Sequence, residues 1–219
     1  MDGLLLDTER RGMGIFADIV QPHGLAAPEA QALFRRCVGR GEAATVALIE
    51  AALPGTDGAA VEADWHRAMD AAVADGVPLR PTVAEALARI AGHGVPVAVV
   101  TSTRTARARA HLEQAGLLAR FVDVIGGDRV PAPKPDPAPY LAGAAALGLP
   151  PGDCAAFEDS DTGTRAALAA GCRVWQVPDL RPPDTPVPQM GQQVAATLAE
   201  AVAAATRARA ARALRGGPG

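Results

Sequence analysis

The sequence predicts an α/β protein in which a doubly wound parallel sheet carries an inserted group of four helices. Residues 9–76 contain apolar residues at helical spacing, separated by Gly and Pro, without convincing alternation of apolar and polar residues. From residue 77 onward, short apolar runs alternate with single helical segments. Strands joined by single helices run parallel in one sheet, with helices on its faces. We therefore expect a core domain of residues 1–8 and 77–219 and a helical subdomain of residues 9–76.

Gly and Pro residues divide the inserted segment into four predicted helices. Pro28 occupies a favourable first-turn position in the second helix, which ends at the break Gly39-Arg40-Gly41. The third helix runs to Pro54, and the fourth extends from about residue 58 to 75. Four short helices of this kind form a compact bundle.

The core segment contains four predicted strands, at residues 95–100, 121–125, 154–157 and 172–177. Helices are expected at residues 82–92, 104–114, 137–147, 163–170 and about 192–214. Sheets of this type bind ligands beyond the carboxyl ends of their strands. Polar residues at those ends are therefore candidate site residues.

Polar motifs stand at these positions. Thr101-Ser102-Thr103 follows the strand at residues 95–100, and Glu158-Asp159-Ser160 follows the strand at residues 154–157. Lys134 begins the loop motif Lys134-Pro135-Asp136-Pro137. A further carboxylate, Asp2, precedes Gly3 on a predicted tight bend.

Lys134 is also the single lysine among 21 basic residues. An ammonium and a guanidinium are not interchangeable at a tight site. We therefore interpret the retention of lysine at this position as evidence of function.

In this order the motifs resemble those of the haloacid dehalogenase-like phosphohydrolases. The branch of the family that this sequence resembles has a helical cap after the first motif and includes β-phosphoglucomutase and sugar-phosphate phosphatases. The family's first motif reads Asp-x-Asp-Gly at the end of a buried strand, and its first Asp is the nucleophile. Met1 occupies the x position, so Asp2 matches the second Asp. The resemblance implies that the nucleophile and the first core strand are absent from this chain, that the reading frame extends upstream, and that the chain alone is inactive.

The resemblance further implies a magnesium-dependent phosphomonoesterase. Asp159 is the expected metal ligand, Glu158 supports it, and the backbone carbonyl of Asp2 contributes another oxygen, as suits a hard cation. The Asp2 carboxyl is the expected general acid and base. Such an enzyme hydrolyses a small phosphorylated metabolite, with a sugar phosphate as the expected substrate and Mg²⁺ as the cofactor.

The phosphate site implied by the resemblance consists of Thr101, Ser102 and Lys134. The Thr101 hydroxyl and neighbouring backbone amides would bind phosphate oxygens. Lys134 would offset the negative charge that develops on the phosphoryl group. Substrate specificity is assigned to Arg40, because the loop around it resembles a mobile cap loop that brings Arg onto a phosphate or a sugar hydroxyl.

Each motif also has a structural interpretation. Glu158-Asp159 is typical of a solvated acidic helix N-terminus ahead of Ser160. Thr101 and its neighbours are typical of an N-cap. The Arg40 loop is equally typical of an interhelical turn with a solvated Arg.

Two departures from the family favour hydrolysis. β-Phosphoglucomutase has a His ten residues after the general acid, and Gly12 stands there in this chain. Dehalogenases of the same fold lack the second Asp and the acidic pair that this chain has. A phosphosugar mutase and a non-catalytic protein that binds phosphorylated ligands or a partner are the alternatives.

The composition of the chain limits the kinds of partner that we expect it to bind. The net charge of −3 and the few aromatic residues (four Phe, two Trp, one Tyr) argue against a nucleic-acid surface. No apolar run approaches the ~20 residues of a membrane helix. Three widely spaced Cys fit neither a disulfide framework nor a metal knuckle. We expect a cytoplasmic monomer or weak dimer that binds small ligands, not nucleic acid or a membrane.

Overall fold

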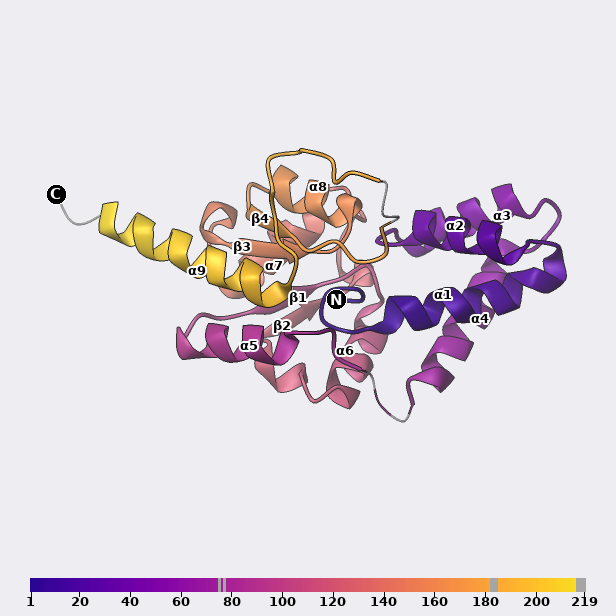
Figure 1. Cartoon of the computed structure of the whole chain (residues 1–219), viewed down its shortest axis with the longest axis horizontal. Helices are drawn as coiled ribbons and strands as arrows, with labels where there is room; N and C mark the ends of the chain where they lie inside the picture. Colours follow the sequence, from indigo (N-terminus) through magenta and orange to yellow (C-terminus); the bar gives the residue numbers. More distant parts are fainter. Residues whose placement is uncertain (75, 77, 182–184, 216–219) are drawn as a thin grey trace.

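The computed structural model describes residues 1–74, 76, 78–181 and 185–215, with side chains described as far as residue 212. Helices α1–α4 form a group at one end of the molecule (Figure 1). Their bounds are α1 Thr8–Val20, α2 Ala27–Cys37, α3 Glu42–Ala52 and α4 Gly58–Ala72. The four helices predicted in this segment are thereby confirmed.

The helical group has an apolar core of its own. Helix α1 packs on α2 and α4, and α3 packs on the same two helices. The rings of Phe16, Phe34 and Trp65 meet at its centre in tilted and edge-on contacts, with centroids 5.4, 5.5 and 5.8 Å apart. Such aromatic contacts add to the free energy gained by burying the rings. These contacts hold the four helices together, while Met69 and Trp65 also pack against the apolar cluster of the first two strands.

All strand pairs in the described residues are parallel, and they form two sheets. One sheet pairs β1 (Ala98–Val100) with β2 (Asp123–Ile125). The other has the order β3 (Ala155–Glu158), β4 (Arg173–Gln176), β5 (Gln193–Val194). The four predicted strands are all present. A single sheet was expected, but β1 pairs only with β2 and β3 only with β4 in the part of the chain that is described.

The beginning of the last helix was predicted wrongly. Residues near 192 were assigned to it, but Gln193 and Val194 pair with Trp175 and Gln176 as strand β5. The Trp175 indole N–H donates to Gln193 Oε1 at 3.1 Å. Because this tertiary contact holds the segment extended, the helix begins only at Leu198.

Four of the remaining helices pack against the sheets in two pairs, and α6 contacts β2. Helix α5 packs on α9, which contacts β3 and β4. Helix α7 packs on α8 and contacts β1 and β2. The bounds are α5 Val83–Gly92, α6 Thr105–Gln114, α7 Ala138–Leu147, α8 Asp161–Ala169 and α9 Leu198–Arg215, and the short 3-10 helices are η1 Gln21–His23, η2 Leu118–Arg120, η3 Gly127–Arg129 and η4 Pro151–Asp153. None of the described helices is long and apolar enough to cross a membrane.

Two chain segments connect the helical group to the sheets, and they lie side by side. Leu6 and Leu79 form an antiparallel bridge, and the Asp7 N–H donates to the Pro78 carbonyl at 2.8 Å. The Arg80 guanidinium lies 2.8 Å from the buried carboxylate of Asp179, in the loop after β4. The place where the chain leaves the core is therefore tied to the place where it returns.

Candidate active site

A cavity of about 530 Å³ lies between helices α1–α4 and the carboxyl ends of β1 and β3. Its core side includes Asp2, Thr101, Lys134 and Asp159, which come from four separate sequence motifs. Parallel strands end at the same edge of their sheet, and this edge is where the motifs meet. The candidate residues Asp2, Thr101, Ser102, Lys134, Glu158, Asp159 and Arg40 all line this cavity.

Asp2 is fixed by two hydroxyl groups. Thr8 Oγ1 donates to Asp2 Oδ1 at 2.7 Å, and Thr103 Oγ1 donates to Asp2 Oδ2 at 2.9 Å. Burial raises the pKa of Asp2, but the Met1 α-ammonium and these two hydrogen bonds outweigh that effect and hold the pKa below its ordinary value. Asp2 is therefore an oriented, ionised carboxylate.

Thr101 is buried directly after β1, and its Oγ1 accepts a hydrogen bond from the Thr103 N–H at 3.2 Å. The N-cap interpretation of this motif is wrong, because the Thr105 N–H at the start of α6 donates to Asp128 Oδ1 at 2.7 Å. Ser102 Oγ donates to the Gly39 carbonyl at 3.2 Å. The strand-end loop is thus folded back on itself and joined to the helical group.

Lys134 is buried in an ion pair with Glu158, with Nζ 2.5 Å from Oε1. Nζ also donates to the Val100 carbonyl at 3.3 Å and lies 5.3 Å from the centroid of the Tyr140 ring. The Tyr140 hydroxyl donates to the same Glu158 oxygen. Burial raises the pKa of Glu158, yet the adjacent ammonium holds it below its ordinary value. Glu158 therefore positions Lys134, and it is buried rather than a solvated helix N-terminus.

Asp159 faces two other carboxyl groups. Burial and the charge of Glu158 raise the pKa of Asp159 to about 7. Gly3 has a φ of +72°, and a Cβ atom there would lie 2.7 Å from Asp159 Oδ2 and 2.9 Å from Glu9 Cδ. The backbone bend after Asp2 therefore packs directly against both carboxyl groups, which only glycine permits.

Glu9 is a site residue that the sequence analysis missed. It is buried at the start of α1, and its Oε2 has no hydrogen-bond partner among the described residues. Burial and the charges of Asp159 and Asp2 raise its pKa well above the ordinary value. A Glu in the first turn is an ordinary helix feature. Its place directly after Asp7-Thr8, close to the first motif, was the available signal.

Arg40 lies at the mouth of the cavity and is exposed. Its Nε donates to the Arg36 carbonyl at 2.7 Å. The preceding Gly39 has a φ of +74°, and a Cβ atom there would lie 2.7 Å from Ser160 Oγ. The loop therefore approaches the core at the strand end, and Arg40 lines the cavity from the side of the helical group.

The expected magnesium ligands share the cavity but do not form a complete set. In the described residues, no three His, Cys, Asp or Glu side chains are grouped as ligands of a metal ion. Glu158 is engaged by Lys134 and Tyr140, and the Asp2 carboxylate by two hydroxyls. Asp159 and Glu9 are the carboxyl groups that these contacts leave free.

The family assignment follows from comparison with known proteins. The haloacid dehalogenase-like hydrolase family matches residues 1–171, which is most of the chain. The chain is 34% identical over 188 residues to hexitol phosphatase A of Escherichia coli, which covers 85% of this chain and 83% of the relative. The chain belongs to the haloacid dehalogenase-like hydrolases.

Other members of this hydrolase family share its sequence and fold. The phosphorylated carbohydrates phosphatase of Thermotoga maritima is 30% identical over 172 residues, 78% of this chain and 79% of the relative. The structure of CbbY from Rhodobacter sphaeroides with phosphate superimposes with a TM-score of 0.75, at 24% identity, and covers 91% of this chain and 92% of that one. This agreement confirms the predicted family and its α/β fold.

Proposed function

We propose that this haloacid dehalogenase-like hydrolase is a magnesium-dependent phosphomonoesterase for a small sugar or polyol phosphate. The observation that supports it best is the convergence of Asp2, Thr101, Lys134 and Asp159 on one cavity. The names of the relatives, a hexitol phosphatase and a phosphorylated carbohydrates phosphatase, favour this substrate class. We further propose that residues 9–76 are the cap and that the protein is a cytoplasmic monomer or weak dimer.

Lys134 and Thr101 have the properties of a phosphate site. The Lys134 ammonium is fixed by Glu158 and the Val100 carbonyl, so its charge requires no reorganisation when a phosphoryl group arrives. The Thr101 hydroxyl lies directly after the end of β1 and faces the same cavity. Ser102 joins this loop to the cap through Gly39. Phosphate binding is therefore coupled in space to the position of the cap.

The surplus of carboxyl groups fits a hard cation. Glu9 Oε2 is buried without a partner, and the pKa of Asp159 is raised to about 7 beside Glu158. A bound cation would relieve both conditions. We propose that Asp159 and the Asp2 carbonyl hold Mg²⁺, whose remaining ligands are water, since this ion retains much of its hydration. The ion supplies charge that neutralises the phosphate oxygens.

Transfer proceeds in two steps in this proposal. In the first, the carboxylate of the residue that precedes Met1 in the family motif attacks phosphorus, the bond from phosphorus to the alcohol oxygen breaks, and Asp2 gives that oxygen its proton. In the second, water attacks phosphorus, the acyl–phosphate bond breaks, and Asp2 accepts the proton from water. The hydrogen bonds from Thr8 and Thr103 favour the ionised Asp2 that the second step needs. Bound phosphate raises the pKa of Asp2 for the first step.

The alternatives receive less support. Gly12 lines the cavity without a proton-carrying side chain, which favours hydrolysis over mutase chemistry. A purely binding role assigns no chemistry to the Asp2 carboxylate, which Thr8 and Thr103 orient in the cavity.

The test compares this chain with an extended chain, in which the in-frame upstream codons are translated ahead of Met1. Release of inorganic phosphate is measured from a panel of sugar and polyol phosphates, with Mg²⁺ or with EDTA. We expect release by the extended chain only, and only with the metal. Failure of the extended chain on every ester, or undiminished release in EDTA, would contradict the proposal.

A further inference from the structure

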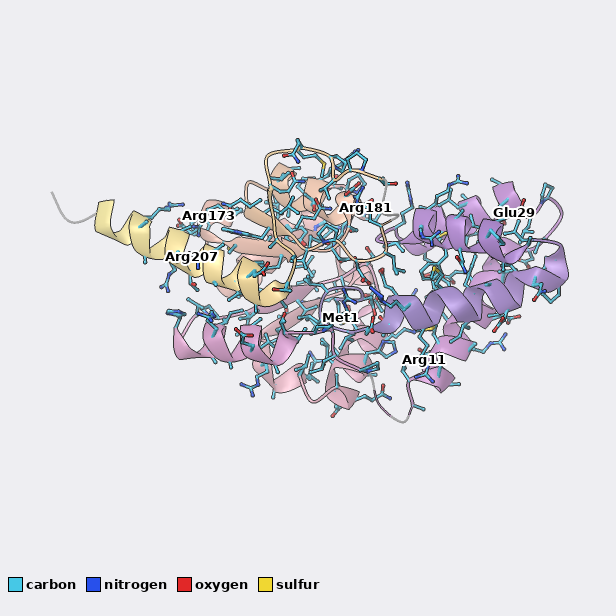
Figure 2. All side chains as sticks on the ribbon, in the orientation of Figure 1. Met1, Arg11, Glu29, Arg173, Arg181 and Arg207 are labelled. Atoms are coloured by element: carbon cyan, nitrogen blue, oxygen red, sulfur yellow. The ribbon has the colours of Figure 1, made fainter. Side chains whose placement is uncertain are left out.

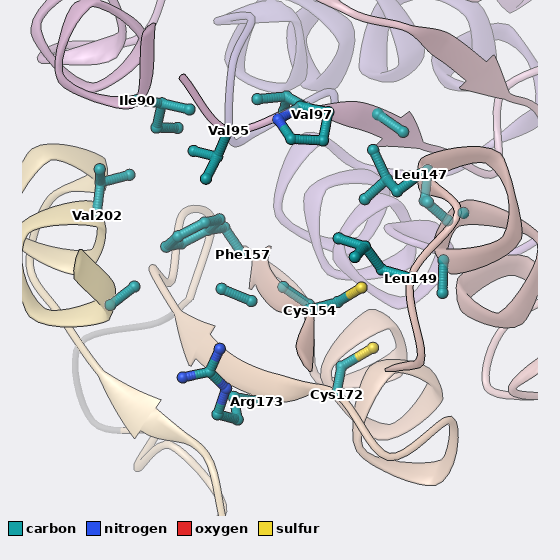
Figure 3. Close-up of a pocket in the computed structure, with 18 of the residues that line it drawn as sticks. Ile90, Val95, Val97, Leu147, Leu149, Cys154, Phe157, Cys172, Arg173 and Val202 are labelled. Carbon is teal, nitrogen blue, oxygen red and sulfur yellow. The ribbon is translucent and has the colours of Figure 1, made fainter. Parts of the chain in front are cut away.

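Two cavities of the protein differ in what their walls can bind. The cavity in Figure 3, of about 550 Å³, is lined by β1 and β3 and has mainly apolar walls, among them Ile90, Leu147 and Val202. The active-site cavity has polar side chains on both sides, because the helical group adds its own to those at the strand ends. A few placed polar groups fix the orientation of a ligand and select it. The wall contributed by the helical group therefore bears on which leaving group is accepted.

Helix α4 supplies one face to that wall. The residues of this face stand at positions i, i+3, i+4 and i+7 and line the active-site cavity: Glu62, Trp65, His66 and Met69. Residues at this spacing lie on one side of an α-helix. Trp65 and Met69 pack into the apolar clusters of the molecule. Glu62 and His66 are therefore the polar members of a face that borders the cavity.

Glu62 is buried, with 7% of its surface exposed. A Glu and a His four residues apart on a helix are more often a solvated surface pair. The hydrogen bonds among the described residues engage Glu62 Oε1, which lies 2.6 Å from His66 Nε2, and leave Oε2 free. Burying a charged group is costly unless it is hydrogen-bonded. A buried carboxylate with a free oxygen beside a cavity therefore indicates a ligand that donates hydrogen bonds.

The His66 ring is held in place by its neighbours. It stacks on the Trp65 ring with centroids 5.1 Å apart and an interplanar angle of 20°, and Nε2 contacts Glu62. Because the ring is fixed in advance, a ligand that binds it loses little further side-chain freedom. The hydrogen bonds among the described residues do not engage Nδ1, the second ring nitrogen. Glu62 and His66 thus present an ordered set of acceptor and donor atoms.

Most arginines that line this cavity are already engaged. Three of the four in the described residues are paired with carboxylates: Arg67 with Asp64, Arg104 with Glu42, and Arg107 with Asp70. The fourth, Arg40, is exposed. Charges that are buried are screened far less than exposed ones. The buried charge that the helical side presents to a leaving group is therefore the negative charge of Glu62.

A phosphate ester in this cavity must face both of its sides. In the proposed function its phosphoryl group lies against Lys134 and Thr101 on the core side. The leaving group then extends toward α4. Hydroxyl groups can donate to Glu62, and the carbon chain can pack on the Trp65 ring.

We propose that Glu62 and His66 form the subsite for the leaving group, and that this subsite takes adjacent hydroxyl groups of an uncharged polyol. A carboxylate accepts hydrogen bonds from two hydroxyls at once. The same carboxylate repels a leaving group that carries a second phosphate or a carboxylate. The position of the phosphate rests on the proposed function. The new element is that Glu62 selects polyol phosphates against bisphosphates and phosphocarboxylates.

The test measures binding to the full chain by isothermal titration calorimetry with Mg²⁺ present, so it does not require turnover. The ligands are sorbitol 6-phosphate, butyl phosphate, phosphoglycolate and inorganic phosphate. We expect sorbitol 6-phosphate to bind at least about tenfold more tightly than butyl phosphate, since an ester without hydroxyls leaves the buried polar groups unpaired. Equal affinities for these two esters would overturn the subsite.

Glu62→Gln keeps the shape of the side chain and removes its charge. It should weaken sorbitol 6-phosphate about tenfold, the size of one hydrogen bond to a charged group, and tighten phosphoglycolate at least about threefold by relief of repulsion. Butyl phosphate should change less than about twofold. His66→Gln, on the less buried partner, should weaken sorbitol 6-phosphate alone. Glu29→Gln is the matched control, because Figure 2 shows Glu29 at the far end of the helical group from Met1.

The two proposals fail separately. Equal losses of sorbitol 6-phosphate and butyl phosphate affinity in Glu62→Gln would show that Glu62 is structural and would overturn the subsite. Binding of inorganic phosphate without preference between the esters would do the same and leave the proposed function standing. The expected preference, with no phosphate release by the extended chain from any ester, would contradict the proposed function alone.

Discussion

The Lys134 ammonium and the Glu158 carboxylate form a buried ion pair with 2.5 Å between Nζ and Oε1, at the point where the loop before α7 meets the end of β3. Breaking such a pair leaves an uncompensated buried charge, which is strongly destabilising. The ion pair therefore keeps the Lys134 ammonium charged and holds it in one position. The predictions below use the extended chain wherever activity is measured.

Lys134→Arg should lower kcat/KM at least about 100-fold, the size expected when one electrostatic contact to the transition state is lost. The larger planar guanidinium cannot occupy a buried site that is shaped by Glu158, Val100 and the Tyr140 ring. Steady-state kinetics on a sugar phosphate measure kcat/KM, and far-UV circular dichroism checks that the fold is kept. Arg129→Lys, an exchange at the exposed partner of Asp123, is the matched control and should be silent. Near-normal turnover of Lys134→Arg would contradict the assigned role.

Asp159 should make metal-free stability depend on pH. Its folded-state pKa of about 7 lies above its ordinary value of 3.8, so its ionisation disfavours the folded state. The free energy of unfolding should therefore fall as pH rises from about 4 to above 7, and Asp159→Asn should flatten this slope. Thermal melts in EDTA across this range measure it.

Mg²⁺ competes with the Asp159 proton, so the apparent affinity of the protein for Mg²⁺ should weaken below pH 7. The substitution Asp159→Asn should weaken this affinity at every pH. Magnesium titrations monitored by Tm supply this measurement. Equal pH slopes and equal magnesium responses in the two proteins would place the metal elsewhere.

Glu9→Gln should stabilise the metal-free protein at pH 8 and weaken its response to Mg²⁺. The amide keeps the shape but removes a buried negative charge that faces Asp159 and Asp2. A Tm gain of about 2–4 °C corresponds to roughly 1 kcal/mol in a domain of this size. Glu29→Gln changes an exposed Glu that accepts from the Ala26 N–H and is the matched control. A lower Tm for Glu9→Gln at pH 8 would show that Glu9 is a satisfied structural group.

Arg40→Ala should change substrate preference more than it changes hydrolysis of p-nitrophenyl phosphate. In the proposed function, a residue of the helical group discriminates between substrates through the leaving group. The ratio of kcat/KM values for a hexitol phosphate and the generic ester is the measurement. Arg36→Ala, four residues earlier on α2, is the control. Equal losses on both esters would place Arg40 in the core chemistry or in folding.

The sequence was sufficient for the features that depend on local pattern. The four strands lie in short, mostly apolar runs, and the strand-end motifs lie where parallel strands direct them. Strand β5 was missed because Gln193 and Val194 carry no strand signal of their own and are held by Trp175. The partner of Glu158 was missed for a related reason. Spacing brings Lys134 and Asp159 into one cavity with Glu158, but only the folded chain decides which carboxylate the ammonium contacts.

The role of Glu9 depends on tertiary structure still more. A Glu in the first turn of a helix gains from the helix dipole whether or not it is buried. Glu9 is a site residue because the folded chain buries it beside Asp159 without a hydrogen-bond partner for Oε2. No local sequence pattern encodes that approach.

The two segments that connect the helical group to the sheets meet at one place, where the Asp7 N–H donates to the Pro78 carbonyl at 2.8 Å. For the sheets, the whole helical group is thus a long insertion whose ends already touch, and closing so short a gap costs little chain entropy. Such an insertion can be exchanged as one unit. Transplanting the corresponding segment of a related phosphatase between Asp7 and Pro78 would change which leaving groups are accepted, while the bridge of Leu6 to Leu79 and the tie of Arg80 to Asp179 stay as they are. In the proposed function, most of the chemistry and the substrate choice therefore lie on parts that can evolve separately, with Thr8 and Glu9 as the site residues that belong to the insertion.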